Sequence, residues 1–182
     1  YFYLTELYGD VPFITDEISI EESLNLERTD EATILSFIYS ELNQAIEELP
    51  RTYSNEENGR ITRGAAIALT SRIHLYHEEY QEAASLAQEL LGEYTLFPDY
   101  GSLFKTENET ANEIILSLQY VPVDREHNIQ YSLIPPSLGG YANFSPLQEL
   151  VDSYPTLNGY AIDDPMANYD EDAPYQNRDP RL

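Results

Sequence analysis

Hydrophobic residues between positions 34 and 49 recur at steps of three and four, a spacing that places one apolar stripe along a helix. The stripe comprises Ile34, Phe37, Ile38, Leu42, Ala45, Ile46 and Leu49. Thr29 or Asp30 can cap the start of this helix, and Glu31 suits its positively polarised first turn. Pro50 cannot continue a helix, so the pattern predicts a helix between Asp30 and Pro50.

Two further helices are predicted in residues 62–92. Thr62 can cap the first, whose face is rich in small side chains, and a break near Glu78 and Glu79 leads into the second. Gly92 can serve as a left-handed cap at the end of the second helix. The face positions are Ala65, Ala66, Leu69, Ile73 and Tyr76 in the first helix, and Ala83, Ala84, Ala87, Leu90 and Leu91 in the second. Small residues let helices approach closely, so residues 62–78 and 80–91 are predicted to form an antiparallel hairpin with the dimensions of a tetratricopeptide-type (TPR-like) repeat.

The remaining segments are less periodic. Residues 1–28 are interpreted as a short helix end followed by a loop, and the apolar run 114–118 as a strand or a buried helical turn. Residues 120–145 show neither helical nor strand periodicity, which predicts a long loop, and their aromatic content argues against disorder. A short helix is predicted after it, built on Leu147, Leu150, Val151 and Tyr154.

These elements predict an all-α fold, a TPR-like helical repeat scaffold with long irregular loops. The 182 residues, 42% of them hydrophobic, suffice for one helical domain spanning residues 1–182. The chain starts at Tyr1 and stops at Leu182. We therefore expect a fragment of a longer chain that lacks its N- and C-terminal parts.

Composition removes several classes of function. Nine basic and 33 acidic residues give a net charge of -24, which disfavours nucleic acid and anionic membrane surfaces as partners. No run of 18 apolar residues exists, so no membrane-spanning segment is predicted. The absence of cysteine excludes disulfides, thiol nucleophiles and thiolate metal sites from this chain.

No motif of known catalytic chemistry is present. The glycine patterns of phosphate-binding loops and dinucleotide folds are missing, as is the Gly-x-Ser-x-Gly elbow. We therefore predict no catalytic residue and no cofactor. Arg178 and Arg181 flank Asp179, and local ion pairs and helix-end contacts are favoured there over an anion clamp.

Two groups of residues have side chains that bind metals elsewhere. His74 and His77 lie three residues apart with Glu78 adjacent, but no ligand from another helix is identifiable, so a helix surface or partner contact is favoured. The acidic residues 163–164 and 170–172 lack the alternating ligands and glycine of a calcium loop. The sequence therefore predicts no metal site.

Several segments, in order and over almost the whole chain, resemble the SusD/RagB family of outer-membrane nutrient-binding lipoproteins of Bacteroidetes. They are Tyr8-Gly9-Asp10-Val11-Pro12, residues 59–66, Arg72-Ile73-His74-Leu75-Tyr76, Tyr80-Gln81-Glu82-Ala83, Glu113-Ile114-Ile115, Ser145-Pro146, residues 150–154, Asn158-Gly159 and residues 177–181. The resemblance implies a non-catalytic protein on the extracellular face of the outer membrane. It also implies capture of an oligosaccharide or another nutrient for a SusC-like TonB-dependent transporter, used in polysaccharide utilisation.

The chain departs from the family pattern at both ends. The lipid-bearing cysteine of the family, its N-terminal region and its C-terminal portion are absent from residues 1–182. Contact with the membrane is therefore expected only through a lipid anchor outside this segment, and the chain is expected to hold only part of a binding site.

The loop at residues 120–145 supplies the candidate ligand-binding residues. Tyr131, Tyr141 and Phe144 are candidate platforms for the apolar face of a sugar ring. Asn128 and Asn143 are candidate hydrogen-bonding partners. The alternative is that these rings only pin a long loop to the helices.

Two other functions stay open at this point. A fragment of a glycoside hydrolase would need two carboxylates across a cleft, and 33 acidic residues make such a pair available by chance. A TPR-like scaffold that binds a peptide would need about three repeats or more, and one hairpin is visible.

Overall fold

The structure, a computed structural model, describes residues 1–121 and 123–182. Within that part of the chain the regular elements are α-helices and short 3-10 helices, with isolated β-bridges and no strand, so the predicted all-α class with long irregular loops is confirmed. The chain folds as two compact units. Residues 1–96 and 112–117 form the first, and residues 97–111 and 118–182 form the second.

The first unit begins with two short helices, α1 (Phe2–Tyr8) and α2 (Ile20–Ser23). Phe2 and Thr5 are buried on one side of α1, consistent with the predicted short helix near the N-terminus. The helix α2 lies in a region predicted as loop, and its start is stabilised by a capping box between Ser19 and Glu22.

Helix α3 (Glu31–Glu48) confirms the first helix predicted from periodicity. The Asp30 side chain caps it by accepting a hydrogen bond from the backbone N–H of Thr33 at 3.3 Å. Ile34, the first residue of the predicted stripe, is fully buried. The other residues of the stripe are half-buried except Phe37, which is exposed, so the stripe faces the interior of the first unit mainly at the start of α3.

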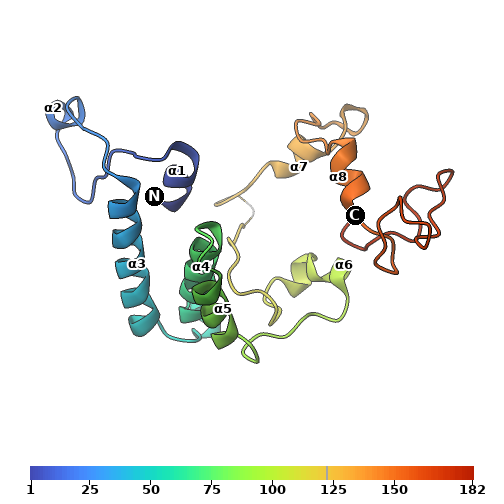
Figure 1. Ribbon diagram of the computed structural model, residues 1–182, viewed down its shortest axis with the longest axis horizontal. Coiled ribbons are helices and arrows are strands. Elements are labelled where there is room, and N and C mark those ends of the chain that lie inside the picture. Colours follow the sequence, from blue (N-terminus) through green and yellow to red (C-terminus); the bar gives the residue numbers. More distant parts are fainter. Residues whose placement is uncertain (122) are drawn as a thin grey trace. The chain divides into compact units, whose positions relative to one another are not determined.

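Helices α4 (Arg63–Tyr76) and α5 (Tyr80–Glu89) form the predicted hairpin, side by side and next to α3 (Figure 1). Thr62 caps α4, and the break between the helices contains Glu78 with a φ of 61°. The antiparallel order follows from the ion pair at 2.8 Å between Arg63, at the start of α4, and Glu89, at the end of α5. The turn after α5 holds Gly92 at φ 89°, beyond a C-cap at Leu90.

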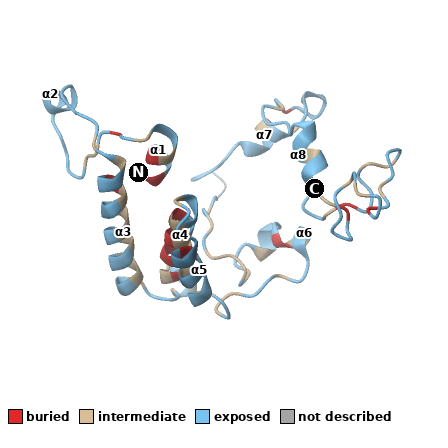
Figure 2. Cartoon of the chain, in the orientation of Figure 1, coloured by how far each residue is buried: buried red, intermediate tan, exposed pale blue. Residues whose placement is uncertain are grey.

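The core of the first unit lies on α4, where buried residues gather on the sides that face α3 and α5 (Figure 2). They are Gly64, Ala65, Ala66, Ile67, Thr70 and Ile73. Small side chains dominate this list, so neighbouring helices can pack closely against α4. The Ser71 hydroxyl adds a link by donating to the Ala83 carbonyl of α5 at 2.8 Å.

The apolar run 114–118 is neither of the two predicted elements, since the structure shows it as irregular backbone. Residues 112–117 belong to the first unit, where Ile115 and Leu116 line an apolar cavity of about 540 Å³ together with residues of α3 and α4. Ile115 and Leu116 therefore pack against these helices without forming secondary structure of their own.

The second unit contains α6 (Tyr100–Leu103), α7 (Ile129–Leu133) and α8 (Gln148–Ser153). Helix α8 confirms the short helix predicted after the loop. The prediction that residues 120–145 lack regular structure is wrong for α7 and for a 3-10 helix at Pro136–Leu138. A five-residue helix is too short to show a 3.6-residue period in the sequence.

Arg178 organises the C-terminal end of the second unit. Its side chain is buried and donates to the backbone carbonyls of Pro174, Val151 and Tyr154 at 2.7 to 2.8 Å. Two of these carbonyls lie at the end of α8, so the predicted helix-end contact is confirmed. The predicted local ion pair is formed by Arg181 and Asp179 at 2.6 Å.

Candidate ligand-binding surface

The predicted platform residues lie on two segments joined by backbone hydrogen bonds. The backbone N–H of Tyr141 donates to the carbonyl of Tyr131 at 2.6 Å, and that of Phe144 donates to Ser132 at 3.3 Å. A third bond, from Ala142 to the carbonyl of Ile134, measures 3.1 Å. The reversal of the chain thus brings Tyr131 and the segment 141–144 side by side.

Two glycines make this reversal possible. Gly139 has a φ of 87°, in the left-handed region that favours glycine. Gly140 is buried, and a Cβ atom at this position would lie 2.0 Å from the carbonyl oxygen of Ile134. Because that neighbour is backbone, any larger residue at position 140 would displace the whole reversal.

The three candidate platform rings are accessible. Tyr131, Tyr141 and Phe144 are 51%, 70% and 66% exposed. These exposures leave part of each side chain accessible to solvent. Asn128 and Asn143 are exposed as well.

A cavity of about 640 Å³ opens in this part of the second unit. Its lining consists of Tyr120, Val121, Arg125, Glu126, His127, Asn128, Gln130 and Tyr131. Two of the five predicted residues, Asn128 and Tyr131, therefore share one hollow. Tyr141, Asn143 and Phe144 are not part of its lining, and the structure places them on the neighbouring exposed segment.

The walls of the cavity combine an aromatic surface with polar groups. Tyr120 and His127 are in edge-to-face contact, with ring centroids 4.7 Å apart. Val121 and Arg125 exchange two backbone hydrogen bonds of 3.0 and 3.1 Å. Glu126 accepts from the backbone N–H of Val123 at 2.9 Å.

The sequence interpretation missed several lining residues. Tyr120 belongs to the aromatic content of residues 120–145, whereas Arg125, His127 and Gln130 form no recognisable motif in the sequence. Arg125 is held by its backbone hydrogen bonds to Val121 and Gln130 lies on helix α7, and neither feature is visible as a periodic pattern.

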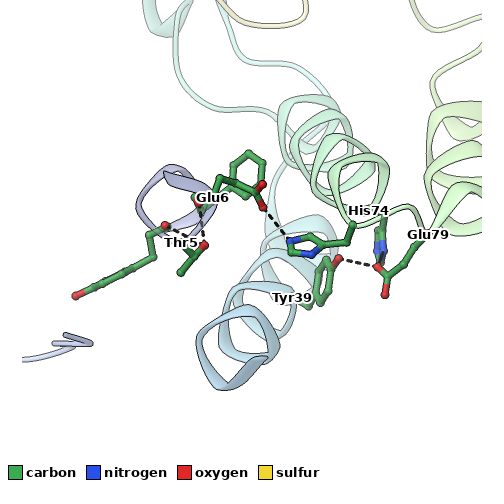
Figure 3. Close-up of polar contacts among 8 residues, drawn as sticks. Thr5, Glu6, Tyr39, His74 and Glu79 are labelled. Atoms are coloured by element: carbon green, nitrogen blue, oxygen red, sulfur yellow. Dashed lines mark hydrogen bonds and ion pairs between the residues drawn. The ribbon is translucent and has the colours of Figure 1, made fainter. Parts of the chain in front are cut away.

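A second polar cluster lies in the first unit, where Tyr39, His74 and Glu79 meet (Figure 3). The Tyr39 hydroxyl donates to Glu79 Oε2 at 2.8 Å, and His74 Nδ1 lies 2.6 Å from the same oxygen. Hydrogen bonds from His74 and then Tyr39 lower the pKa of Glu79, while burial and the nearby Glu79 carboxylate raise the pKa of Tyr39. The cluster ties α3 to the turn between α4 and α5.

His74 and His77 point to different partners. His74 faces Glu79, whereas His77 Nε2 lies 3.1 Å from Glu6 Oε1 on α1. The structure therefore does not bring the two histidines together as a ligand pair.

The known proteins that are similar to this chain are all SusD-like proteins in the matches described below. A SusD-like family model, described as starch-binding and associating with the outer membrane, matches residues 1–75. A SusD-like protein of Formosa agariphila is 34% identical over 122 residues, which cover 66% of this chain and 23% of that protein. The chain spans about a quarter of the length of the curated relatives it matches.

Solved structures extend the similarity to the whole chain. A SusD-like carbohydrate-binding protein of Bacteroides fragilis matches with a TM-score of 0.88 and 27% identity, covering 100% of this chain and 36% of that one. A second SusD-like protein of the same species matches with a TM-score of 0.81 and 28% identity, covering 99% and 39%. The TPR-like helical scaffold predicted from the helix pair is thereby confirmed.

Proposed function

We propose that this chain, which is similar to SusD-like proteins, is a non-catalytic part of a nutrient-binding protein that captures an oligosaccharide through residues 120–144. The observation that carries the proposal is the cavity that holds Asn128 and Tyr131 next to the exposed rings of Tyr141 and Phe144. Similarity to a B. fragilis protein described as carbohydrate-binding supports the same ligand class.

The chemistry of the surface suits a sugar. A pyranose ring has an apolar face that packs on an aromatic ring and hydroxyl groups that need hydrogen-bonding partners. Tyr131 offers the ring, and the side chains of Asn128 and Gln130 offer amide donors and acceptors in the same cavity. Its volume of about 640 Å³ lies within the range of small-molecule sites. Tyr141, Asn143 and Phe144 would extend the surface along a longer chain of sugars.

The small number of carboxylates that line the cavity supports binding of a sugar without its hydrolysis. Glycoside hydrolysis requires two carboxylates that flank the scissile bond, about 5 to 10 Å apart. Among the described residues that line the cavity, Glu126 is the one carboxylate, and it is already bonded to the backbone of Val123. Release of reducing sugar from oligosaccharides by the purified chain would contradict this part of the proposal.

We infer that the intact protein is a lipoprotein on the extracellular face of the outer membrane, where it delivers ligand to a SusC-like TonB-dependent transporter. The description of the matching family as associating with the outer membrane supports this location. No helix in the described part of the chain is long and apolar enough to cross a membrane. Co-purification of the intact protein with a barrel transporter from detergent-solubilised outer membranes would test the partner.

Affinity electrophoresis against a panel of polysaccharides, including soluble starch, tests the binding site. We expect Tyr131→Ala and Asn128→Ala to reduce retardation of the chain in the gel that contains its ligand. Tyr80→Ala is the matched control, because Tyr80 is also exposed but lies on α5 of the first unit. Equal retardation of all three variants and the wild type would place the ligand elsewhere.

A further inference from the structure

Three side chains able to bind a metal converge from three helices of the first unit. Glu6 lies on α1, Glu31 begins α3, and His77 caps the end of α4. One ligand atom from each of these residues lies within 4.8 Å of the other two. Glu6 Oε1 lies 3.1 Å from His77 Nε2, and Figure 3 shows the Glu6 side chain on α1.

Two atoms of this group are buried and lack a hydrogen-bond partner. Glu6 Oε1 and His77 Nε2 are both inaccessible to solvent, and neither has a hydrogen bond of acceptable geometry. Their separation of 3.1 Å makes them an ion pair only if the imidazole is protonated. Buried polar atoms without partners are rare and call for an explanation.

The electrostatics of the group also call for a cation. Two carboxylates close together in a partly buried place repel each other unless a positive charge lies between them. Among the described residues, no arginine ion pair includes Glu6 or Glu31. The neighbouring His74 is engaged with Glu79 instead.

We propose that Glu6, Glu31 and His77 form a binding site for a divalent transition-metal ion, Zn²⁺ by preference. Zinc takes imidazole nitrogen and carboxylate oxygen at about 2.0 to 2.2 Å, so two ligand atoms of a tetrahedral ion lie about 3.4 Å apart. The distance of 3.1 Å between Glu6 and His77 is close to this value. Imidazole in the ligand set disfavours Ca²⁺ and Mg²⁺, which prefer oxygen.

A backbone hydrogen bond near the site holds the segments that carry Glu6 and Glu31 close together. The backbone N–H of Glu31 donates to Asp10 Oδ1 at 3.0 Å, which fixes the start of α3 against the segment after α1. A metal ion at this point would join α1, α3 and α4. The role that follows is structural, and it is separate from the ligand surface of the second unit.

Isothermal titration of the 182-residue chain with ZnCl₂ tests the site, with excess Mg²⁺ present to occupy the acidic surface. We expect one Zn²⁺ per chain, and visible absorption bands of a protein-bound ion when Co²⁺ replaces Zn²⁺. His77→Ala should weaken Zn²⁺ binding about tenfold or more. The matched control is His74→Ala, which removes a histidine from the same helix and should leave the affinity unchanged.

Glu31→Gln provides a second variant, because it keeps the size of the side chain and removes one anionic ligand. We expect it to lower the affinity for Zn²⁺ while circular dichroism reports a folded chain. Absence of stoichiometric binding overturns the proposal, as does equal affinity of wild type, His77→Ala and Glu31→Gln. If His77→Ala lowers thermal stability but not Zn²⁺ affinity, the group is an ion pair only and the proposal is also overturned.

Discussion

The ring of Tyr39 on α3 lies flat against the imidazole of His74 on α4, with centroids 4.4 Å apart and 13° between the planes. The hydroxyl of the same tyrosine donates to Glu79, which His74 also contacts. One side chain therefore joins α3 to both helices of the hairpin. Stacking and a charge-assisted hydrogen bond act at the same point of the framework.

Tyr39→Phe keeps the stack and removes the hydrogen bond to Glu79. We expect a loss of about 1 kcal/mol in the free energy of unfolding, because a partly exposed bond to a charged acceptor is lost. In a Glu79→Gln background the same substitution should cost less, since the acceptor no longer carries a charge. Urea denaturation followed by circular dichroism measures both. Equal costs in the two backgrounds would show that the hydroxyl and the carboxylate are not coupled.

Gly64 on α4 has no room for a side chain, because a Cβ atom there would lie 2.1 Å from the hydroxyl oxygen of Tyr94. In an open helix, glycine to alanine gains about 1 kcal/mol. We expect Gly64→Ala to destabilise the wild type by displacing Tyr94, and to stabilise a Tyr94→Ala variant. Thermal denaturation of the four proteins gives the sign in each background. Stabilisation in both would mean that Tyr94 moves aside at no cost.

Arg178→Met should destabilise the second unit by about 3 kcal/mol, because three backbone carbonyls lose a charged donor in a buried place. Arg178→Lys should not restore the loss, since one ammonium group cannot reproduce the fork of a guanidinium. Arg181→Met is the control, and its partly exposed ion pair with Asp179 should contribute much less to stability than the buried contacts of Arg178. Denaturant midpoints that shift equally for Arg178→Met and Arg181→Met would contradict this account.

Asp179 offers a test by pH. Its side-chain and backbone hydrogen bonds with Arg181 lower the pKa of its carboxyl to about 2. A lowered pKa in the folded state stabilises the fold above the unfolded pKa of about 3.8, and this contribution is lost as the pH falls toward 2. NMR titration of the carboxyl carbon should give a midpoint near pH 2 in the wild type and a higher one in Arg181→Gln. An unchanged midpoint in the variant would exclude Arg181 as the cause.

The helices that could be predicted from the sequence are those with a long apolar stripe. α3 and α4 have buried faces that recur every three or four residues, and Asp30 and Thr62 mark their starts. Helix α7 was missed because its five residues contain no buried side chain. The run at 114–118 stayed ambiguous because its packing against α3 and α4 depends on tertiary structure.

The candidate sites also differ in how far the sequence predicts them. Asn128 and Tyr131 stand out in an aromatic loop, so they were predicted, and the structure places them in one cavity. The proposed zinc ligands could not be found, because Glu6, Glu31 and His77 are far apart in the sequence and meet only when three helices pack. In a chain with 33 acidic residues, a single glutamate carries no signal.

The oligosaccharide site that we propose lies in residues 120–144 of this chain. The most direct test is a two-dimensional ¹H–¹⁵N NMR titration of the chain with maltoheptaose, xylohexaose and cellohexaose. We expect at least one of them to shift the amide signals of Asn128, Tyr131 and Tyr141 in a saturable way, while the signals of α3 to α5 stay in place. Saturable shifts confined to α3, α4 and α5, or no shift with any of the three sugars, would contradict the proposal.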